Sequence, residues 1–177
     1  ADERSIMTYL LQYFHAFSGS QKAELAGKRI SKLLAGLRSN EELRHDYETR
    51  AQQWLAWAAH KTDELNSTKF DNSLEGAKRD LEELKSFQST EKPEKAAQKL
   101  AIEGVFNNLQ VKLRNAKRSP YVPPVGAAPA NLEGSWDTLQ KAERVREQAI
   151  RDEIAKQQKM EELYKRFMEK QAKLKAW

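Results

Sequence analysis

The chain has 177 residues, no cysteine, 39% hydrophobic residues and 31 Lys and Arg against 26 Asp and Glu. This composition predicts one helix-rich intracellular unit and excludes a disulfide framework or a thiolate metal site. Acids and bases alternate, as in the run Glu143 to Glu147, which predicts solvated helix surface rather than a nucleic-acid or membrane footprint, and no apolar run is long enough to span a bilayer.

The first predicted element is a short amphipathic helix within residues 1–18. Its apolar positions lie three or four residues apart: Ile6, Leu10, Tyr13 or Phe14, and Phe17. Such an aromatic face is poorly suited to water, so we expect it to pack in a domain that lies mostly outside this chain. The runs DERSIMTY at 2–9 and YFHAF at 13–17 resemble the closing helix of the second calponin-homology domain of alpha-actinin, beta-spectrin and filamin.

A neck helix is predicted within residues 19–39, after the turn-forming residues 18–20. It carries four aliphatic residues with cationic neighbours, which we call the neck stripe: Ile30, Leu33, Leu34 and Leu37. Their spacing places them on one helix face, as a calmodulin-like lobe requires of its target. The same residues also extend the hydrophobic seam of the next helix, and the sequence leaves both interpretations open.

Three long helices are predicted in residues 40–175, because apolar residues recur there at steps of three and four. Helix A is expected at about 40–65, helix B at about 73–115 and helix C at about 132–175. The capping-box spacing of residues 39–42 permits helix A to start there, although continuous passage through Gly36 is also allowed.

Three further signals refine these boundaries. Pro93 predicts a break in helix B between about Ser89 and Glu94, because proline removes a helical hydrogen bond. Asn72 and Glu75 have capping-box spacing at the start of helix B. Residues 118–126 and Pro129 are expected to form a nonhelical, partly extended linker, with the N-cap of helix C at Asn131.

Large side chains at seam positions are expected to form the structural core. They are Trp54, Trp57, Leu109, Trp136, Leu139 and Phe167. Paired tryptophans sometimes form a ligand cage, but on amphipathic helices they more often anchor a core. Irregular seams on three long helices predict an all-α, up-down-up coiled-coil bundle of three helices.

No catalytic, cofactor-binding or metal-binding motif is recognisable. His15, His45 and His60 lie on different predicted segments without ligand spacing, and the carboxylates lie among lysines and arginines. Glycine-rich phosphate loops and nucleophile motifs do not occur in the sequence. We therefore expect neither an enzyme nor a cofactor.

Trp57 and Trp177 lie 120 residues apart, so residues 176–177 are expected to begin a second repeat. Trp57 matches the usual tryptophan in the first helix of a spectrin repeat, and Trp136 with Leu139 matches the pair in the third helix. With FNNLQ at 106–110 and SWDTLQKAE at 135–143, the chain resembles the first rod repeat of alpha-actinins, most closely those of unicellular eukaryotes. Beta-spectrin is a near relative, and the polar stretch at 59–63 departs from the family pattern.

The resemblance implies the neck and first spectrin repeat of a cytoplasmic, cytoskeletal protein that cross-links actin filaments and sets their spacing. The implied partners are actin through a missing head domain, a calmodulin-like domain of an opposing subunit at the neck stripe, and an antiparallel second rod. No nucleic acid is expected. The alternatives are a beta-spectrin-like rod of a membrane skeleton and a membrane-binding helical dimer.

Overall fold

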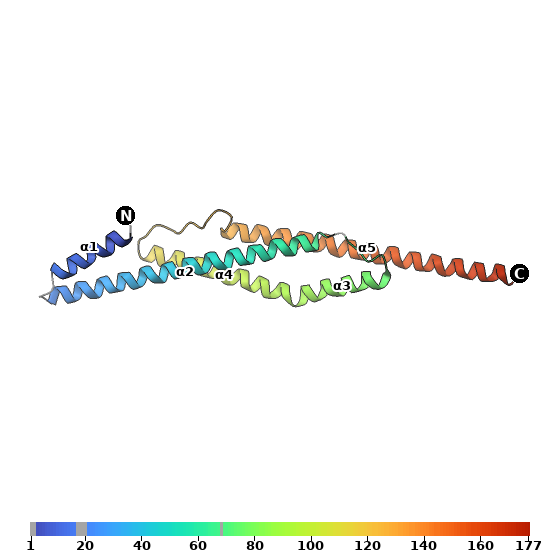
Figure 1. The fold of residues 1–177 in the computed structure, drawn as a ribbon, viewed down its shortest axis with the longest axis horizontal. Helices are drawn as coiled ribbons and strands as arrows, with labels where there is room; N and C mark the ends of the chain where they lie inside the picture. The colour runs from blue at the N-terminus through green and yellow to red at the C-terminus, as the bar shows by residue number, and fades with distance from the viewer. Residues whose placement is uncertain (1–2, 17–20, 68) are drawn as a thin grey trace. The chain divides into compact units, whose positions relative to one another are not determined.

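A computed structural model describes residues 3–16, 21–67 and 69–177, and within them it contains helices and no strand. The helices are α1 (Glu3–Ala16), α2 (Gln21–Leu65), α3 (Leu74–Ser89), α4 (Glu91–Asn115) and α5 (Pro129–Lys175) (Figure 1). The all-α prediction is confirmed. The turn predicted at residues 18–20, Asp2, Phe17, Thr68 and the side chain of Phe14 lie outside the described residues.

The described chain forms two units, and the boundary between them crosses two helices. Unit 1 comprises Ala1–Tyr47 and Val105–Tyr121, and unit 2 comprises Glu48–Gly104 and Val122–Trp177. The neck and helix A are one uninterrupted helix, α2, instead of two helices divided near residue 39. The capping box at residues 39–42 is not used, because the N–H groups that it would satisfy take part in continuous helical hydrogen bonding.

Helix B is two helices, α3 and α4, separated at Thr90. The Ser86 carbonyl accepts the Thr90 backbone N–H at 3.0 Å, the Thr90 hydroxyl at 2.6 Å and the Ser89 hydroxyl at 3.1 Å. The Ser86 carbonyl thus keeps its helical partner, the N–H four residues later, and accepts two hydroxyl donors in addition. Pro93 is the third residue of α4, in the first turn, where its missing N–H costs no helical hydrogen bond.

The cap of α3 is one residue later than the sequence predicts. Ser73, with φ −136° and ψ 150°, is the N-cap, and its hydroxyl accepts the Gly76 backbone N–H at 3.0 Å. Gly76 is needed in this turn, because a Cβ at that position would lie 2.8 Å from the Asp71 side chain. The prediction that Asn72 caps this helix is therefore wrong.

The start of α5 also differs from the prediction, since Pro129 is its first residue. Proline suits the first helical position because its N–H is not required there and its φ is already helical. Ala128 occupies the N-cap position, and the Asn131 side-chain oxygen accepts the Ala128 N–H at 3.2 Å from the first turn. Gly126, with φ 87°, makes the turn that precedes the helix.

The end of α4 is closed by a pair of hydrogen bonds. The Lys117 N–H donates to the Arg114 carbonyl and the Arg118 N–H donates to the Leu113 carbonyl, both at 2.9 Å. This is the Schellman pattern, which places its C′ residue in the left-handed region. That residue is Lys117, with φ 54°, at a position that ordinarily favours glycine.

Unit 2 is a three-helix bundle made by the C-terminal part of α2, by α3 with the first half of α4, and by α5. Helices α3 and α5 lie side by side (Figure 1). Its buried apolar residues come from all three segments: Ala51, Trp54, Ala58, Leu65, Ala77, Leu84, Phe87, Ile102, Leu132, Leu139, Ala142 and Ile150. This up-down-up arrangement confirms the spectrin-type fold.

Helix α5 continues past the loop that joins α2 to α3 (Figure 1). Every residue from Gln158 to Trp177 is exposed. Phe167 is 61% exposed, so its prediction as a core residue is wrong for this chain. The reason is that α2 ends at Leu65 and α3 begins at Leu74, so this part of α5 extends beyond the other described helices of unit 2.

Candidate functional site

The neck stripe lies on the unit 1 part of α2, and its four members have unequal environments. Leu33 is 59% exposed, whereas Ile30, Leu34 and Leu37 are half-buried. Ile30 and Leu34 line a groove between α1 and α2 whose α1 wall is apolar: Met7, Leu10 and Leu11. Two members of the stripe therefore face α1, Leu37 is half-buried outside this groove, and Leu33 is exposed.

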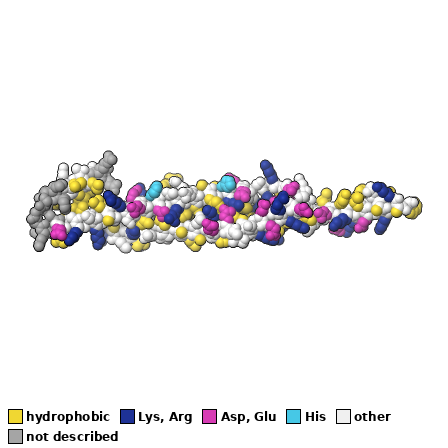
Figure 2. Space-filling view, turned by 60° about the horizontal axis from the view of Figure 1, so that its bottom comes forward, with side chains coloured by type: hydrophobic (Ala, Val, Ile, Leu, Met, Phe, Trp, Pro, Cys, Tyr) yellow, Lys and Arg dark blue, Asp and Glu magenta, His cyan; other side chains and the backbone are white. Residues whose placement is uncertain are grey.

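Charge is distributed unevenly between the two units. The sequence of unit 1 contains 11 Lys and Arg and six Asp and Glu, so it carries the whole net charge of +5. Unit 2 contains 20 residues of each sign and is neutral. On the face seen in Figure 2, acidic and basic side chains alternate along the helices, as expected for solvated helix surfaces. The basic excess of the chain is thus a property of the unit that carries the neck stripe.

An aromatic cluster fixes the end of α4 in unit 1. Tyr47 is fully buried, and its ring centroid lies 5.3 Å from that of Phe106 and 6.1 Å from that of Tyr121. The Gln110 amide binds Tyr121 twice, accepting its backbone N–H at 3.2 Å and donating to its carbonyl at 2.6 Å. The Arg44 guanidinium lies 5.7 Å from the Tyr121 ring centroid. Sequence reasoning missed Tyr121, because the surrounding prolines indicated only a linker.

A tryptophan cluster links α2, α4 and α5 in unit 2. Trp54 is 2% exposed, and its indole N–H donates to the Lys95 carbonyl at 2.9 Å. Its ring centroid lies 6.0 Å from that of Trp136 and 5.9 Å from that of Trp57. Trp57 and Trp136 are half-buried, so they border the core instead of filling it. Of the other predicted core residues, Leu139 is 0% exposed in unit 2, and Leu109 of α4, in unit 1, is 1% exposed.

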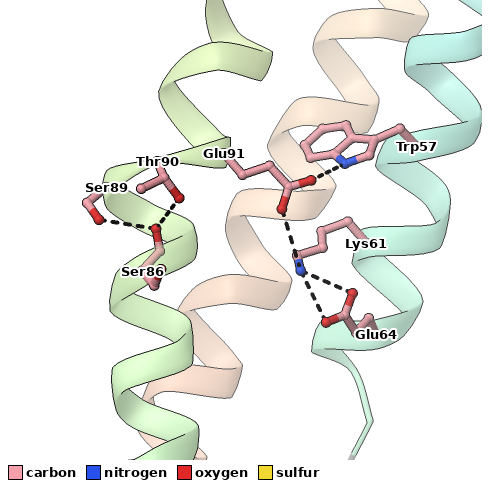
Figure 3. A network of polar contacts seen from close by, with 7 residues as sticks. All are labelled: Trp57, Lys61, Glu64, Ser86, Ser89, Thr90 and Glu91. Atoms are coloured by element: carbon pink, nitrogen blue, oxygen red, sulfur yellow. Dashed lines mark hydrogen bonds and ion pairs between the residues drawn. The ribbon is translucent and has the colours of Figure 1, made fainter.

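A polar network joins α2 to the first residue of α4 at the α3–α4 break (Figure 3). The Trp57 indole N–H donates to the Glu91 carboxylate at 2.7 Å. The Lys61 ammonium lies 3.8 Å from the other Glu91 oxygen and 3.1 Å from the Glu64 carboxylate. The Trp57 indole and the Lys61 ammonium, both on α2, thereby hold the Glu91 carboxylate at the start of α4.

A buried carboxylate joins α5 to both sides of the same break. Glu143 is 5% exposed, and its two oxygens accept from Lys92 at 2.6 Å and from Gln88 at 2.8 Å. The prediction that this charged run is solvated surface is wrong for Glu143. The signal that identifies it is position: Glu143 lies four residues after Leu139 and seven before Ile150, in the buried register of the helix.

Arg146 belongs to the same charged run, residues 143–147, and its side chain also contacts other parts of the bundle. Its guanidinium pairs with Asp80 at 3.2 Å, donates to the Ser67 carbonyl and lies 4.6 Å from the Phe70 ring centroid. One side chain of α5 thus contacts α3 and the loop between α2 and α3. It closes the end of the bundle at which α5 leaves its neighbours.

Lys99 of α4 forms a third polar link, in this case to α5. It is 8% exposed and pairs with Glu133 of α5 and with Glu103 of its own helix, the latter at 3.0 Å. Burial lowers the pKa of Lys99, but the hydrogen bonds and charges of Glu133 and Glu103 outweigh this effect and raise the pKa above its ordinary value. The cation is thus stabilised where it is buried.

The described residues contain no group of three His, Cys, Asp or Glu side chains arranged to hold a metal ion. His45 and His60 are exposed on α2, and the side chain of His15 lies outside the described residues. Among the described helices, none is long and apolar enough to cross a membrane.

No protein-family model matches the chain. Alpha-actinin A of Dictyostelium discoideum is 38% identical over 176 residues, which cover 99% of this chain and 20% of that protein. The spectrin beta chain of Drosophila melanogaster is 35% identical over the same share of this chain and 8% of its own length. Alpha-actinin-1 of Homo sapiens is 34% identical over 99% of this chain and 20% of that protein.

The chain therefore spans about a fifth of the alpha-actinins that it matches and a smaller part of the spectrin. The matched segment includes both units and all five helices. The resemblance found in the sequence is confirmed. The chain is a spectrin-type helical segment of the kind found in alpha-actinin and beta-spectrin.

Proposed function

We propose that this chain is the neck and first repeat of an actin-filament cross-linking protein, in which it acts as a structural rod and spacer. Residues 1–18 are assigned to the end of a calponin-homology domain, 19–39 to the neck, 40–175 to the repeat and 176–177 to the next repeat. The single observation that best supports this assignment is that α2 contains both the neck stripe and the first helix of the bundle without interruption. The relatives are structural cytoskeletal proteins, and this chain is likewise not an enzyme.

The rod role rests on how unit 2 is built. Its helices are linked by buried apolar contacts and by interhelical polar pairs: Trp57–Glu91, Lys92–Glu143, Lys99–Glu133 and Asp80–Arg146. These links join segments that are 34 to 66 residues apart in sequence, so the bundle unfolds as a unit. Such a bundle suits a cytoplasmic spacer in the cytoskeleton.

The actin contact of the intact protein is assigned to a head domain outside this chain, and rod pairing to an antiparallel second copy. Co-sedimentation with filamentous actin tests the first assignment. The 177-residue chain is expected to stay in the supernatant, and the same chain extended by its preceding domain is expected to pellet. Pelleting of the short chain alone would contradict the assignment of the actin contact to the missing head.

The neck stripe is assigned as the docking site for a calmodulin-like domain of the opposing subunit. Leu33 is 59% exposed, and unit 1 carries the net positive charge that a carboxylate-rich calcium-binding lobe would complement. Docking at Ile30 and Leu34 would require α1 to move, because both residues line its groove. Exposed Leu33 is therefore the residue expected to make the first contact.

Titration calorimetry with a calmodulin-like domain tests this docking site. Leu33→Asp with Leu37→Asp is expected to abolish the binding heat. Leu25→Asp is the matched control, because Leu25 is also 59% exposed on α2 but lies outside the stripe. Unchanged heat in the stripe variant, or equal loss in the control, would reject the assignment.

A beta-spectrin-like rod of a membrane skeleton is the second candidate, and the 35% identity to a spectrin beta chain favours it. The two candidates differ in the domains expected beyond Trp177. Calcium-binding EF-hands after a short rod would favour the cross-linker, and a long series of further repeats would favour the spectrin-like rod. Sequencing beyond Trp177 distinguishes the two.

A further inference from the structure

Ser119 lies in the segment between α4 and α5 and is followed by Pro120. It is the only serine or threonine in the sequence that precedes a proline, since the other four prolines follow Lys92, Val122, Pro123 and Ala128. Proline restricts the preceding residue to extended or polyproline backbone. Residues 118–120 are accordingly exposed and nonhelical.

This geometry sets Ser119 apart from hydroxyls within the helices. Thr62, Ser89, Thr90 and Thr138 each donate a hydrogen bond to a backbone carbonyl three or four residues earlier. Their backbones are helical or at a helix end, and an enzyme that takes an extended peptide would first have to unfold them. Ser119 already lies exposed on nonhelical backbone.

The segment that contains Ser119 is held at both ends. Before it, Lys117 and Arg118 make the hydrogen-bonded end of α4. After it, Tyr121 is bound through its backbone by Gln110 and through its ring by the aromatic cluster. Ser119 is therefore presented on a short fixed segment, which reduces the ordering entropy that an enzyme must supply.

The surrounding charge favours an added anion. No acidic residue lies between Glu103 and Glu133, whereas the end of α4 and its cap supply four cations: Lys112, Arg114, Lys117 and Arg118. A phosphate carries about −1.5 to −2 charge at neutral pH and forms charge-assisted hydrogen bonds with nearby Arg and Lys. It would lower the net charge of unit 1 from +5 to about +3.

We infer that Ser119 is a phosphorylation site for a proline-directed serine/threonine kinase that uses a nucleoside triphosphate. In this step the Ser119 hydroxyl oxygen forms a bond to the γ-phosphorus, and the bond from that phosphorus to the β-phosphate oxygen breaks. The nucleoside diphosphate leaves, and a base of the kinase takes the hydroxyl proton. The step involves no change of oxidation state.

Phosphorylation of the folded 177-residue chain by a proline-directed kinase with Mg²⁺ and ATP tests the inference. Intact mass is expected to increase by one phosphate, and peptide mapping is expected to place it on Ser119. Ser119→Ala is expected to take up none. Pro120→Ala is expected to lower the initial rate about tenfold or more, the usual effect of losing one specificity contact.

Two controls make the result decisive. A peptide of residues 112–126 reports whether the sequence is a substrate when nothing holds it, and Gln110→Ala releases Tyr121 from its clamp without altering the recognised residues. A rate for the folded chain that equals or exceeds that of the peptide supports the site. Phosphorylation of the peptide or of Gln110→Ala but not of the folded wild-type chain would overturn it, as would a rate unaffected by Pro120→Ala.

Discussion

The Lys92 ammonium lies 2.6 Å from the Glu143 carboxylate and joins α4 to α5 beside the break at Thr90. Glu143 is 5% exposed, and Gln88 of α3 donates to its other oxygen. One buried carboxylate thus receives donors from both sides of the break. Such a group is costly to leave unpaired, because desolvation is not recovered when its partners are removed.

Glu143→Gln is expected to destabilise the bundle by about 1–3 kcal/mol, because it removes the charge-assisted bond to Lys92 at a buried site. The double variant Lys92→Met with Glu143→Leu is expected to be less destabilised than the single change, since apolar replacement of a buried pair is often neutral. Urea unfolding followed by circular dichroism measures both. Arg151→Ala, which breaks an exposed pair with Glu147, is the control and is expected to cost less than about 1 kcal/mol.

The ion pairs of Lys99 predict that the unfolding free energy depends on pH in the alkaline range. Its folded pKa is raised, so its contribution to stability is fully present below the unfolded pKa of about 10.4 and is lost as pH rises through the folded pKa. Unfolding free energies compared between about pH 9 and pH 11 for wild type and Lys99→Met are therefore expected to converge as pH rises. Lys170→Met, at the exposed end of α5, is expected to retain the wild-type pH profile; an unchanged gap for Lys99→Met would contradict the prediction.

Sequence periodicity predicted the fold because the spacing of apolar residues largely decides which face of a helix is buried. It identified Trp54 and Leu139, which are nearly inaccessible to water. It failed for Glu143, whose charge indicated solvent although its register indicated the core. Composition outweighed position in that prediction. The partners Lys92 and Gln88 lie on other helices, so the sequence of α5 itself does not reveal them.

Helix ends were harder to predict, because several residues compete for each cap. Pro129 was read as a helix breaker, yet at the first helical position it lacks nothing that the helix needs. Asn72 and Ser73 both have side chains that can cap, and the close approach of Gly76 to Asp71 accompanies the choice of Ser73. For the neck stripe, sequence spacing indicated a common face, but only the structure separates Ile30 and Leu34, which line the α1 groove, from exposed Leu33.

Lys117→Gly is expected to stabilise the chain by about 1 kcal/mol, because a left-handed backbone costs a non-glycine residue about 1–2 kcal/mol. Lys117 has φ 54° and closes the end of α4, so the glycine would keep both hydrogen bonds of the motif. Arg118→Gly is the matched control, since Arg118 does not have a positive φ and glycine there would only add unfolded-state entropy. Thermal unfolding compares the two, and a lower midpoint for Lys117→Gly would contradict the strain argument.

The exposed end of α5 predicts a mutational effect that depends on chain length. Phe167 lies 120 residues after Tyr47, the same interval that separates Trp177 from Trp57, so it holds the position that Tyr47 holds in α2. Tyr47 is 0% exposed and Phe167 is 61% exposed, so Tyr47→Ala is expected to cost about 3–5 kcal/mol and Phe167→Ala less than about 0.5 kcal/mol in the 177-residue chain.

If α5 supplies the first helix of a following repeat, extending the chain by that repeat will bury Phe167 and raise the cost of Phe167→Ala toward that of Tyr47→Ala. Chemical unfolding of both variants in the short and extended chains measures the change, and a Phe167→Ala cost that is the same in both would show that no neighbouring helices cover this part of α5.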